Sequence, residues 1–176
     1  MAIGDMRDWV RSVAERAEKK MRSNGRVGRR ANREKELFSL RARSVKGLFS
    51  EIEALATAIN KELPEPAIKT HRSLNPKNLG GIEVPDGARL ALEFLERRVE
   101  VVVQPLGSVG GRPAPLGGLA TASVIQYDRS NPAAADWFDI ALREDGAWSH
   151  KAIDPGAASP GFGDKDMRTL LEWLVS

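Results

Sequence analysis

The chain has 176 residues and contains no cysteine. This absence excludes disulfides, thiol nucleophiles, thiolate zinc sites and cysteine-bound iron–sulfur clusters. Histidine is scarce too, because His71 and His150 are the only two. A metal site made of several histidines from one chain is therefore not expected. The composition predicts neither a bound metal nor a cofactor.

Long apolar runs are also missing. No stretch of the sequence approaches the ~20 apolar residues that a membrane-spanning helix needs. The first ten residues, MAIGDMRDWV, carry charge from Asp5 onward and lack the apolar centre of a signal peptide. These absences predict a soluble, cytoplasmic protein without a membrane span.

Charge is distributed unevenly along the chain. The formal net charge is +3, but residues 7–46 hold 14 basic and 5 acidic residues, a net charge of +9. The remainder holds 13 basic and 19 acidic residues, a net charge of −6. Such a division is typical of an interaction segment, a nucleic-acid contact or acid–base pairing between subunits. A solvated helix face explains it equally well.

A first helix is predicted from Asp5, which can cap it, to about Arg22. Asn24 and Gly25 then indicate a helix end. Residues 26–30, with Gly28 among three arginines, read as a mobile basic hinge. The apolar residues of this helix recur at the spacing of one helical stripe. They are Met6, Trp9, Val10, Val13, Ala14, Ala17 and Met21.

A second and longer helix is predicted from Asn32 to Leu63, before Pro64. Its apolar residues repeat every seven positions. A second series with the same spacing forms a second seam, and further apolar residues widen the apolar stripe. The residues that this pattern places at a helix interface are Phe38, Val45, Leu48, Phe49, Ile52, Leu55 and Ile59. Arg41 and Glu62 fall on the second seam and would weaken a zipper. The pattern favours packing within the chain's own domain, with self-association as the alternative.

The rest of the sequence predicts an antiparallel sheet. Residues 64–80 are rich in Pro, Asn and Gly and read as a linker. The turn sequence Pro85-Asp86-Gly87 predicts a hairpin between residues 81–84 and 88–95, although 88–95 could also form a helix. Further strands are expected at residues 99–103, 119–127, 137–142 and 147–153, the last two joined by a turn at 144–146.

A closing helix is predicted from Asp164 or Asp166, with Met167, Leu170, Leu171 and Leu174 on one face. The fold class is therefore α+β: two N-terminal helices, the second long, then an antiparallel β-meander of about five strands and a C-terminal helix. The corresponding domains are a basic helical region (1–63), a linker (64–80) and the sheet with its closing helix (81–176).

No catalytic signature is present in the sequence. The glycine-rich loop at residues 107–118 matches neither the dinucleotide fingerprint nor the Walker loop. Ser149 and His150 would point to opposite faces of a strand, so they cannot form a nucleophile–base pair. If the protein were an enzyme, Arg112, His150 and Asp154 would be the candidate groups, but we predict that it is not one.

The sequence favours a non-catalytic interaction or assembly protein. It would bind a protein partner, or a second copy of itself, through its basic N-terminal helices. The alternative is a nucleic-acid-binding protein that contacts phosphates through the same segment. The predicted contact residues are Arg16, Lys19, Lys20, Arg22, Arg26, Arg29, Arg30 and Arg33.

Overall fold

The computed structural model describes residues 3–79, 81–106, 108–109, 112–113, 119–151 and 159–176. Of these, the side chains of residues 3–10, 23, 24, 26, 27, 108, 109, 112 and 113 are not described. The chain divides into two units, one ending at Glu36 and one beginning at Leu37. We call residues 3–36 the N-terminal segment and residues 37–176 the sheet domain, and describe each by itself.

One helix, α1 (Ile3–Glu62), occupies the whole N-terminal part of the chain. The predicted division into two helices is therefore wrong, and so is the hinge at residues 26–30. Each glycine in a helix interior costs only about 1 kcal/mol relative to alanine. Gly25 and Gly28 lower helix propensity but do not end the helix, which stops just before Pro64.

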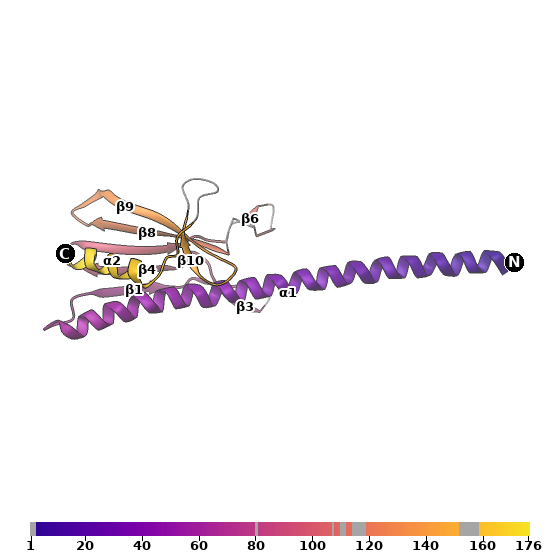
Figure 1. The fold of residues 1–176 in the computed structure, drawn as a ribbon, viewed down its shortest axis with the longest axis horizontal. Coiled ribbons are helices and arrows are strands. Elements are labelled where there is room, and N and C mark those ends of the chain that lie inside the picture. Colours follow the sequence, from indigo (N-terminus) through magenta and orange to yellow (C-terminus); the bar gives the residue numbers. More distant parts are fainter. Residues whose placement is uncertain (1–2, 80, 107, 110–111, 114–118, 152–158) are drawn as a thin grey trace. The chain divides into compact units, whose positions relative to one another are not determined.

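The main sheet of the sheet domain has six antiparallel strands in the order β1-β4-β5-β8-β9-β10 (Figure 1). Its strands are β1 (Lys69–Ser73), β4 (Arg89–Phe94), β5 (Arg97–Val103), β8 (Ala120–Asp128), β9 (Asn131–Leu142) and β10 (Trp148–His150). Two further pairs lie outside it: β2 (Pro76–Leu79) with β3 (Ile82–Pro85), and β6 (Ser108–Val109) with β7 (Arg112–Pro113). The predicted α+β class with an antiparallel meander is confirmed, with six strands instead of about five.

The segment between α1 and β5 differs from the prediction. The expected linker at residues 64–80 contains β1 and β2, and β3 pairs with β2 instead of with residues 88–95. The missed signal is the Gly80-Gly81 pair in the sequence, which favours a two-residue hairpin turn; Gly81 has φ +87. Residues 89–94 form strand β4 between β1 and β5, which settles the strand-or-helix alternative.

The C-terminal elements follow the sequence closely. Strands β9 and β10 form the predicted hairpin, and Gly146 supplies the positive φ of its turn. Helix α2 (Asp164–Val175) buries Met167, Leu170, Leu171 and Leu174, as predicted. Gly163 is its N-cap, and the Asp166 carboxylate accepts the Gly163 N–H at 3.0 Å.

The core lies on one face of the main sheet. Alternate residues of each central strand point to it, such as Leu90 and Leu92 on β4 and Val99 and Val101 on β5. The sheet-domain part of α1 and helix α2 pack on this face and complete one hydrophobic cluster. Among the described residues, no helix covers the opposite face, which we call the open face (Figure 1).

A buried arginine joins α1 to the end of β3, to the residue after β5 and to the residue before β8. Arg41 is 3% exposed, and its guanidinium donates hydrogen bonds to the carbonyl oxygens of Pro85 (3.0 Å), Gln104 (2.8 Å) and Leu119 (3.0 Å). Burial lowers the pKa of Arg41, and the charge of Asp86 opposes this effect. Arginine nevertheless stays protonated in proteins. One cation therefore joins the helix to three chain segments.

The two edges of the main sheet are protected differently. The segment after β10 covers that strand: His150 N–H donates to Pro160, and Phe162 N–H donates to Trp148, both at 2.9 Å. At the other edge, β1 pairs with β4 alone among the described strands. All five residues of β1 are exposed.

Replacing Arg41 with methionine should lower the free energy of unfolding by about 3 kcal/mol or more, because three partly buried carbonyl groups lose their donors. Urea denaturation of the full chain measures this loss. Arg43→Met is the matched control, because Arg43 is exposed on the same helix and should change stability by less than about 0.5 kcal/mol. Equal stability of the two variants would show that Arg41 does not fasten the helix.

Candidate functional site

The N-terminal segment is solvent-exposed along its described length. Every described residue from Arg11 to Glu36 is exposed. The large apolar side chains that are described here are no exception, since Val13 is 39% and Met21 is 74% exposed. This contrasts with the same helix after Leu37, where Val45 and Phe49 are fully buried. Burial in a core therefore does not explain the choice of the described residues between Arg11 and Glu36.

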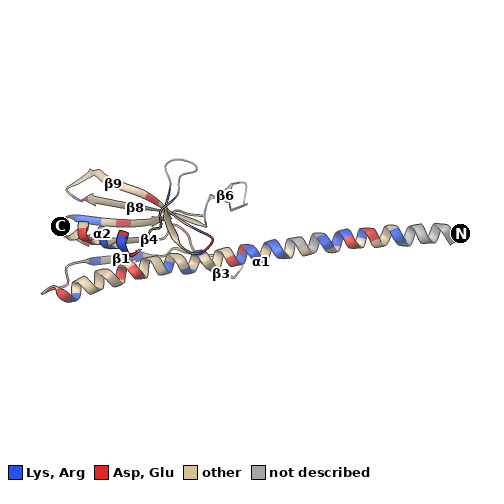
Figure 2. Cartoon of the chain, viewed as in Figure 1, with Lys and Arg blue, Asp and Glu red and all other residues tan. Residues whose placement is uncertain are grey.

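Most of the predicted contact residues fall on one face of this helix. From Lys19 to Arg33 the sequence has seven basic residues and no acidic one. With 3.6 residues per turn, five residues whose side chains are described fall within about 100° of arc along ~21 Å of helix. We call these five the basic stripe: Lys19, Arg22, Arg29, Arg30 and Arg33. Figure 2 shows basic residues, in blue, along this part of α1. Arg16 and Lys20 are exposed on other faces.

Acidic partners lie at the ends of the basic stripe. Arg22 pairs with Glu18 at 2.5 Å, and Arg30 pairs with Glu34 at 3.4 Å. Such exposed pairs contribute only ~0.3–0.5 kcal/mol each. The Arg29 guanidinium donates to the Gly25 carbonyl oxygen at 3.2 Å, and Lys19 forms no ion pair with a described residue. The stripe therefore keeps a net positive charge that faces solvent.

The predicted helix-interface residues lie in the sheet domain and are used there. Val45, Leu48, Phe49 and Ile52 are buried in the core cluster. Leu55 and Ile59 are partly buried against it, and Phe38 is half-buried. These side chains pack on the chain's own sheet, whereas the side chains of the basic stripe are exposed.

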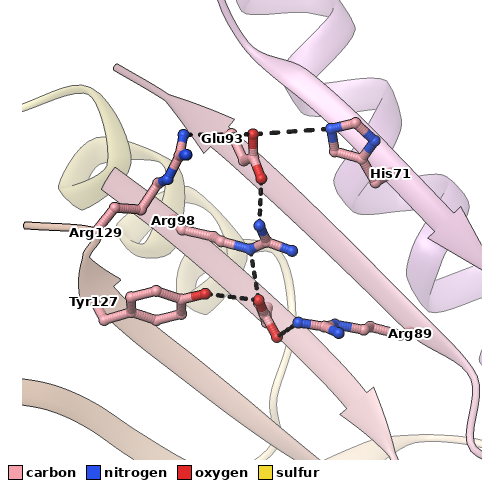
Figure 3. Close-up of polar contacts among 7 residues, drawn as sticks. His71, Arg89, Glu93, Arg98, Tyr127 and Arg129 are labelled. Carbon is pink, nitrogen blue, oxygen red and sulfur yellow. Dashed lines mark hydrogen bonds and ion pairs between the residues drawn. The ribbon is translucent and has the colours of Figure 1, made fainter. Parts of the chain in front are cut away.

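A second polar cluster lies on the open face of the main sheet, and the sequence analysis did not identify it. Glu100 on β5 is 4% exposed and accepts hydrogen bonds from Arg89 on β4 and from Tyr127 on β8, the latter at 2.9 Å. Arg98 pairs with the Glu100 carboxylate at 2.5 Å and also with Glu93 (Figure 3).

The register of the strands assembles this cluster. Glu93 lies opposite Arg98, and Arg98 lies opposite Tyr127, so the three side chains share one face across β4, β5 and β8. Glu93 is also within 3.8 Å of His71 Nε2 and within 4.0 Å of Arg129 Nη1 (Figure 3). The sequence signal was the alternation of charged and apolar residues in both strands, but it does not reveal which charges meet.

Glu100 is held as an anion. Burial alone raises the pKa of a carboxyl group, but hydrogen bonds from Arg89 and Tyr127 and the charge of Arg98 outweigh it, so the pKa of Glu100 is lowered. Burial is the main cause that raises the pKa of Tyr127, and the hydrogen bond to Glu100 is the second. Tyr127 therefore remains a neutral donor. Both carboxylate oxygens are occupied by partners. The arrangement stabilises the sheet and does not present a general acid or base.

The residues considered for catalysis are not brought together among the described side chains. The His150 imidazole lies 3.0 Å from the Asp166 carboxylate and against the rings of Phe138 and Phe162. The Ser149 hydroxyl donates instead to the Ala141 carbonyl oxygen at 3.4 Å. Arg112 lies in β7, and Asp154 lies outside the described residues, as does most of the 107–118 loop.

Within the described ranges, no group of three or more His, Asp or Glu side chains is arranged to hold a metal ion. The described helices include none that is long and apolar enough to cross a bilayer. Comparison of the chain with protein-family models, with curated proteins and with solved structures finds no match. The basic stripe is therefore the candidate functional site, on the geometry alone.

Replacing Glu100 with glutamine should destabilise the sheet domain by about 2 kcal/mol at neutral pH, because Arg89 and Arg98 lose their counter-charge. The lowered pKa of Glu100 means that its ionised form stabilises the fold above the ordinary carboxyl value of 4.5. This contribution disappears as the pH falls through the lower folded value.

Urea denaturation between pH 7 and pH 3 tests both points. The difference between wild type and Glu100→Gln should be largest at neutral pH and should shrink below about pH 4. Glu96→Gln, at an exposed position of the β4–β5 turn, is the matched control and should follow the wild type. A constant difference at every pH would contradict the ionised state of Glu100.

Proposed function

We propose that this chain is a non-catalytic interaction protein that binds the acidic surface of a protein partner through the basic stripe. One observation carries the proposal: an exposed row of cations on one helix face, with no acidic residue between Lys19 and Arg33. Complementary charge brings partners together and selects among them. The sheet domain supplies the stable fold that carries this helix.

A second copy of the chain is one partner with suitable charge. Residues 1–36 contain 11 basic and 6 acidic residues, whereas residues 37–176 contain 16 basic and 18 acidic residues. The basic stripe of one molecule would then meet acidic surface of the sheet domain of another. Such reciprocal contacts are the usual basis of symmetric dimers.

Nucleic acid is the second candidate, and a separate observation favours it. Typical protein interfaces have large apolar or aromatic side chains at their centre. Between Gly28 and Glu36, where three residues of the basic stripe lie, the largest apolar residue is Ala31. Phosphate contacts need only cations, so this part of the helix suits a partner recognised by charge alone. Because no reading motif is evident, such binding would be insensitive to base sequence.

Replacing Arg29 and Arg30 together with alanine should weaken binding to poly-L-glutamate roughly five- to thirtyfold at low salt, since each exposed charge contributes about 0.5–1 kcal/mol. Alanine preserves helix propensity, so the change reports the loss of charge. Fluorescence anisotropy with the full chain measures the affinity, and a short DNA duplex of arbitrary sequence serves as the second probe.

Lys46→Ala with Lys165→Ala is the matched control, because both lysines are exposed in the sheet domain and the pair removes the same charge. Its affinity should equal that of the wild type. Binding of the duplex without binding of poly-L-glutamate would favour the second candidate. Light scattering at low and high salt tests the second copy as partner, and a monomer under both conditions would exclude it.

A further inference from the structure

The basic stripe places like charges at spacings that oppose helix formation. Lys19 and Arg22, Arg29 and Arg33, and Arg30 and Arg33 lie three or four residues apart on one face. Like charges at these spacings destabilise a helix. The stabilising ion pairs of Arg22 and Arg30 are with Glu18 and Glu34, which lie outside the stretch from Lys19 to Arg33.

The same stretch contains residues of low helix propensity. Asn24, Gly25 and Gly28 follow one another within five positions at its centre, and asparagine and glycine are poor helix formers. The described residues around them are exposed, so no buried apolar face compensates. Most helices in proteins depend on such a face for their stability.

From these observations we infer that the helix between Lys19 and Arg33 is completed by its anionic partner. Acidic groups placed along the basic stripe neutralise the repulsion between its cations and make the helical form the stable one. The helix that the structure shows in this stretch is then the form that binds the partner, the free chain leaves it by local unfolding, and binding and helix stabilisation occur together. This inference rests on the proposed function, because it requires the stripe to be the binding surface.

Two glycines allow the inference to be tested without changing any charge. A Cβ added at Gly25 or at Gly28 meets no atom within 4 Å. Alanine at both positions therefore raises helix propensity without creating or removing a contact. If the helix must form on binding, a helix that is already formed binds more tightly.

The experiment measures hydrogen exchange of the full chain, with and without poly-L-glutamate, at low salt. In the wild type, we expect amides between residues 19 and 33 to become roughly tenfold more protected on binding. In Gly25→Ala with Gly28→Ala they should be protected beforehand and gain little. That variant should also bind roughly tenfold more tightly.

Gly47→Ala is the matched control, because Gly47 lies in the sheet-domain part of α1 and its added Cβ also meets no atom within 4 Å. Its affinity and its exchange in residues 19–33 should equal those of the wild type. Protection of residues 45–56 reports whether each variant keeps its fold.

Sodium chloride provides a test on the free chain. Salt screens the repulsion within the stripe, so it should increase protection of residues 19–33 while it weakens binding of the polyanion. Poly-L-glutamate that binds with no change in exchange overturns this inference and leaves the proposed function intact. If poly-L-glutamate does not bind, the proposed function fails, and the salt response of the free chain still decides whether the helix is limited by repulsion.

Discussion

Arg41 lies where helix α1 meets three chain segments of the sheet domain, and its single guanidinium binds a carbonyl oxygen from each. A buried cation is costly unless its donors are satisfied. Here the donors face Pro85, Gln104 and Leu119, which lie far from Arg41 in the sequence, so the interaction forms only when the loops are correctly placed. The apolar stripe packs α1 on the sheet. The three hydrogen bonds of Arg41 fix how far the helix lies along its axis and how it is rotated about that axis.

Helix α1 has two parts that differ in sequence and in burial. After Leu37 the residues of the apolar repeat pack in the core, with Val45, Phe49 and Ile52 buried against the sheet. Before Glu36 the described residues are exposed, so none of them packs in a core. The excess of positive charge lies in this exposed part. The residues that pack in the core and the exposed basic residues thus occupy separate parts of one helix.

Patterns among residues close together in the sequence predicted the elements that such residues define. The seven-residue repeat from Phe38 to Ile59 predicted the buried helix face, and the turn at Gly146 predicted the last hairpin. Contacts between distant residues were not predictable. Arg41 looked like a defect in the apolar seam because its three acceptors lie 44 to 78 residues away. The Glu100 cluster depends on strand register, which composition does not determine.

The edges of the main sheet limit how copies of this protein can associate. One edge strand, β10, is bonded to the chain's own Pro160–Phe162 segment. The neighbouring exposed half of β9 contains Pro132, which has no N–H to donate, and a register shift opposite Gln126 and Asp128. At the far edge, β1 bears Lys69 and Arg72, so two such strands would bring cations together. Edge-to-edge pairing of sheets from different copies, which would lead to fibrils, is therefore disfavoured at both edges, even at the high local concentration that an assembly would create.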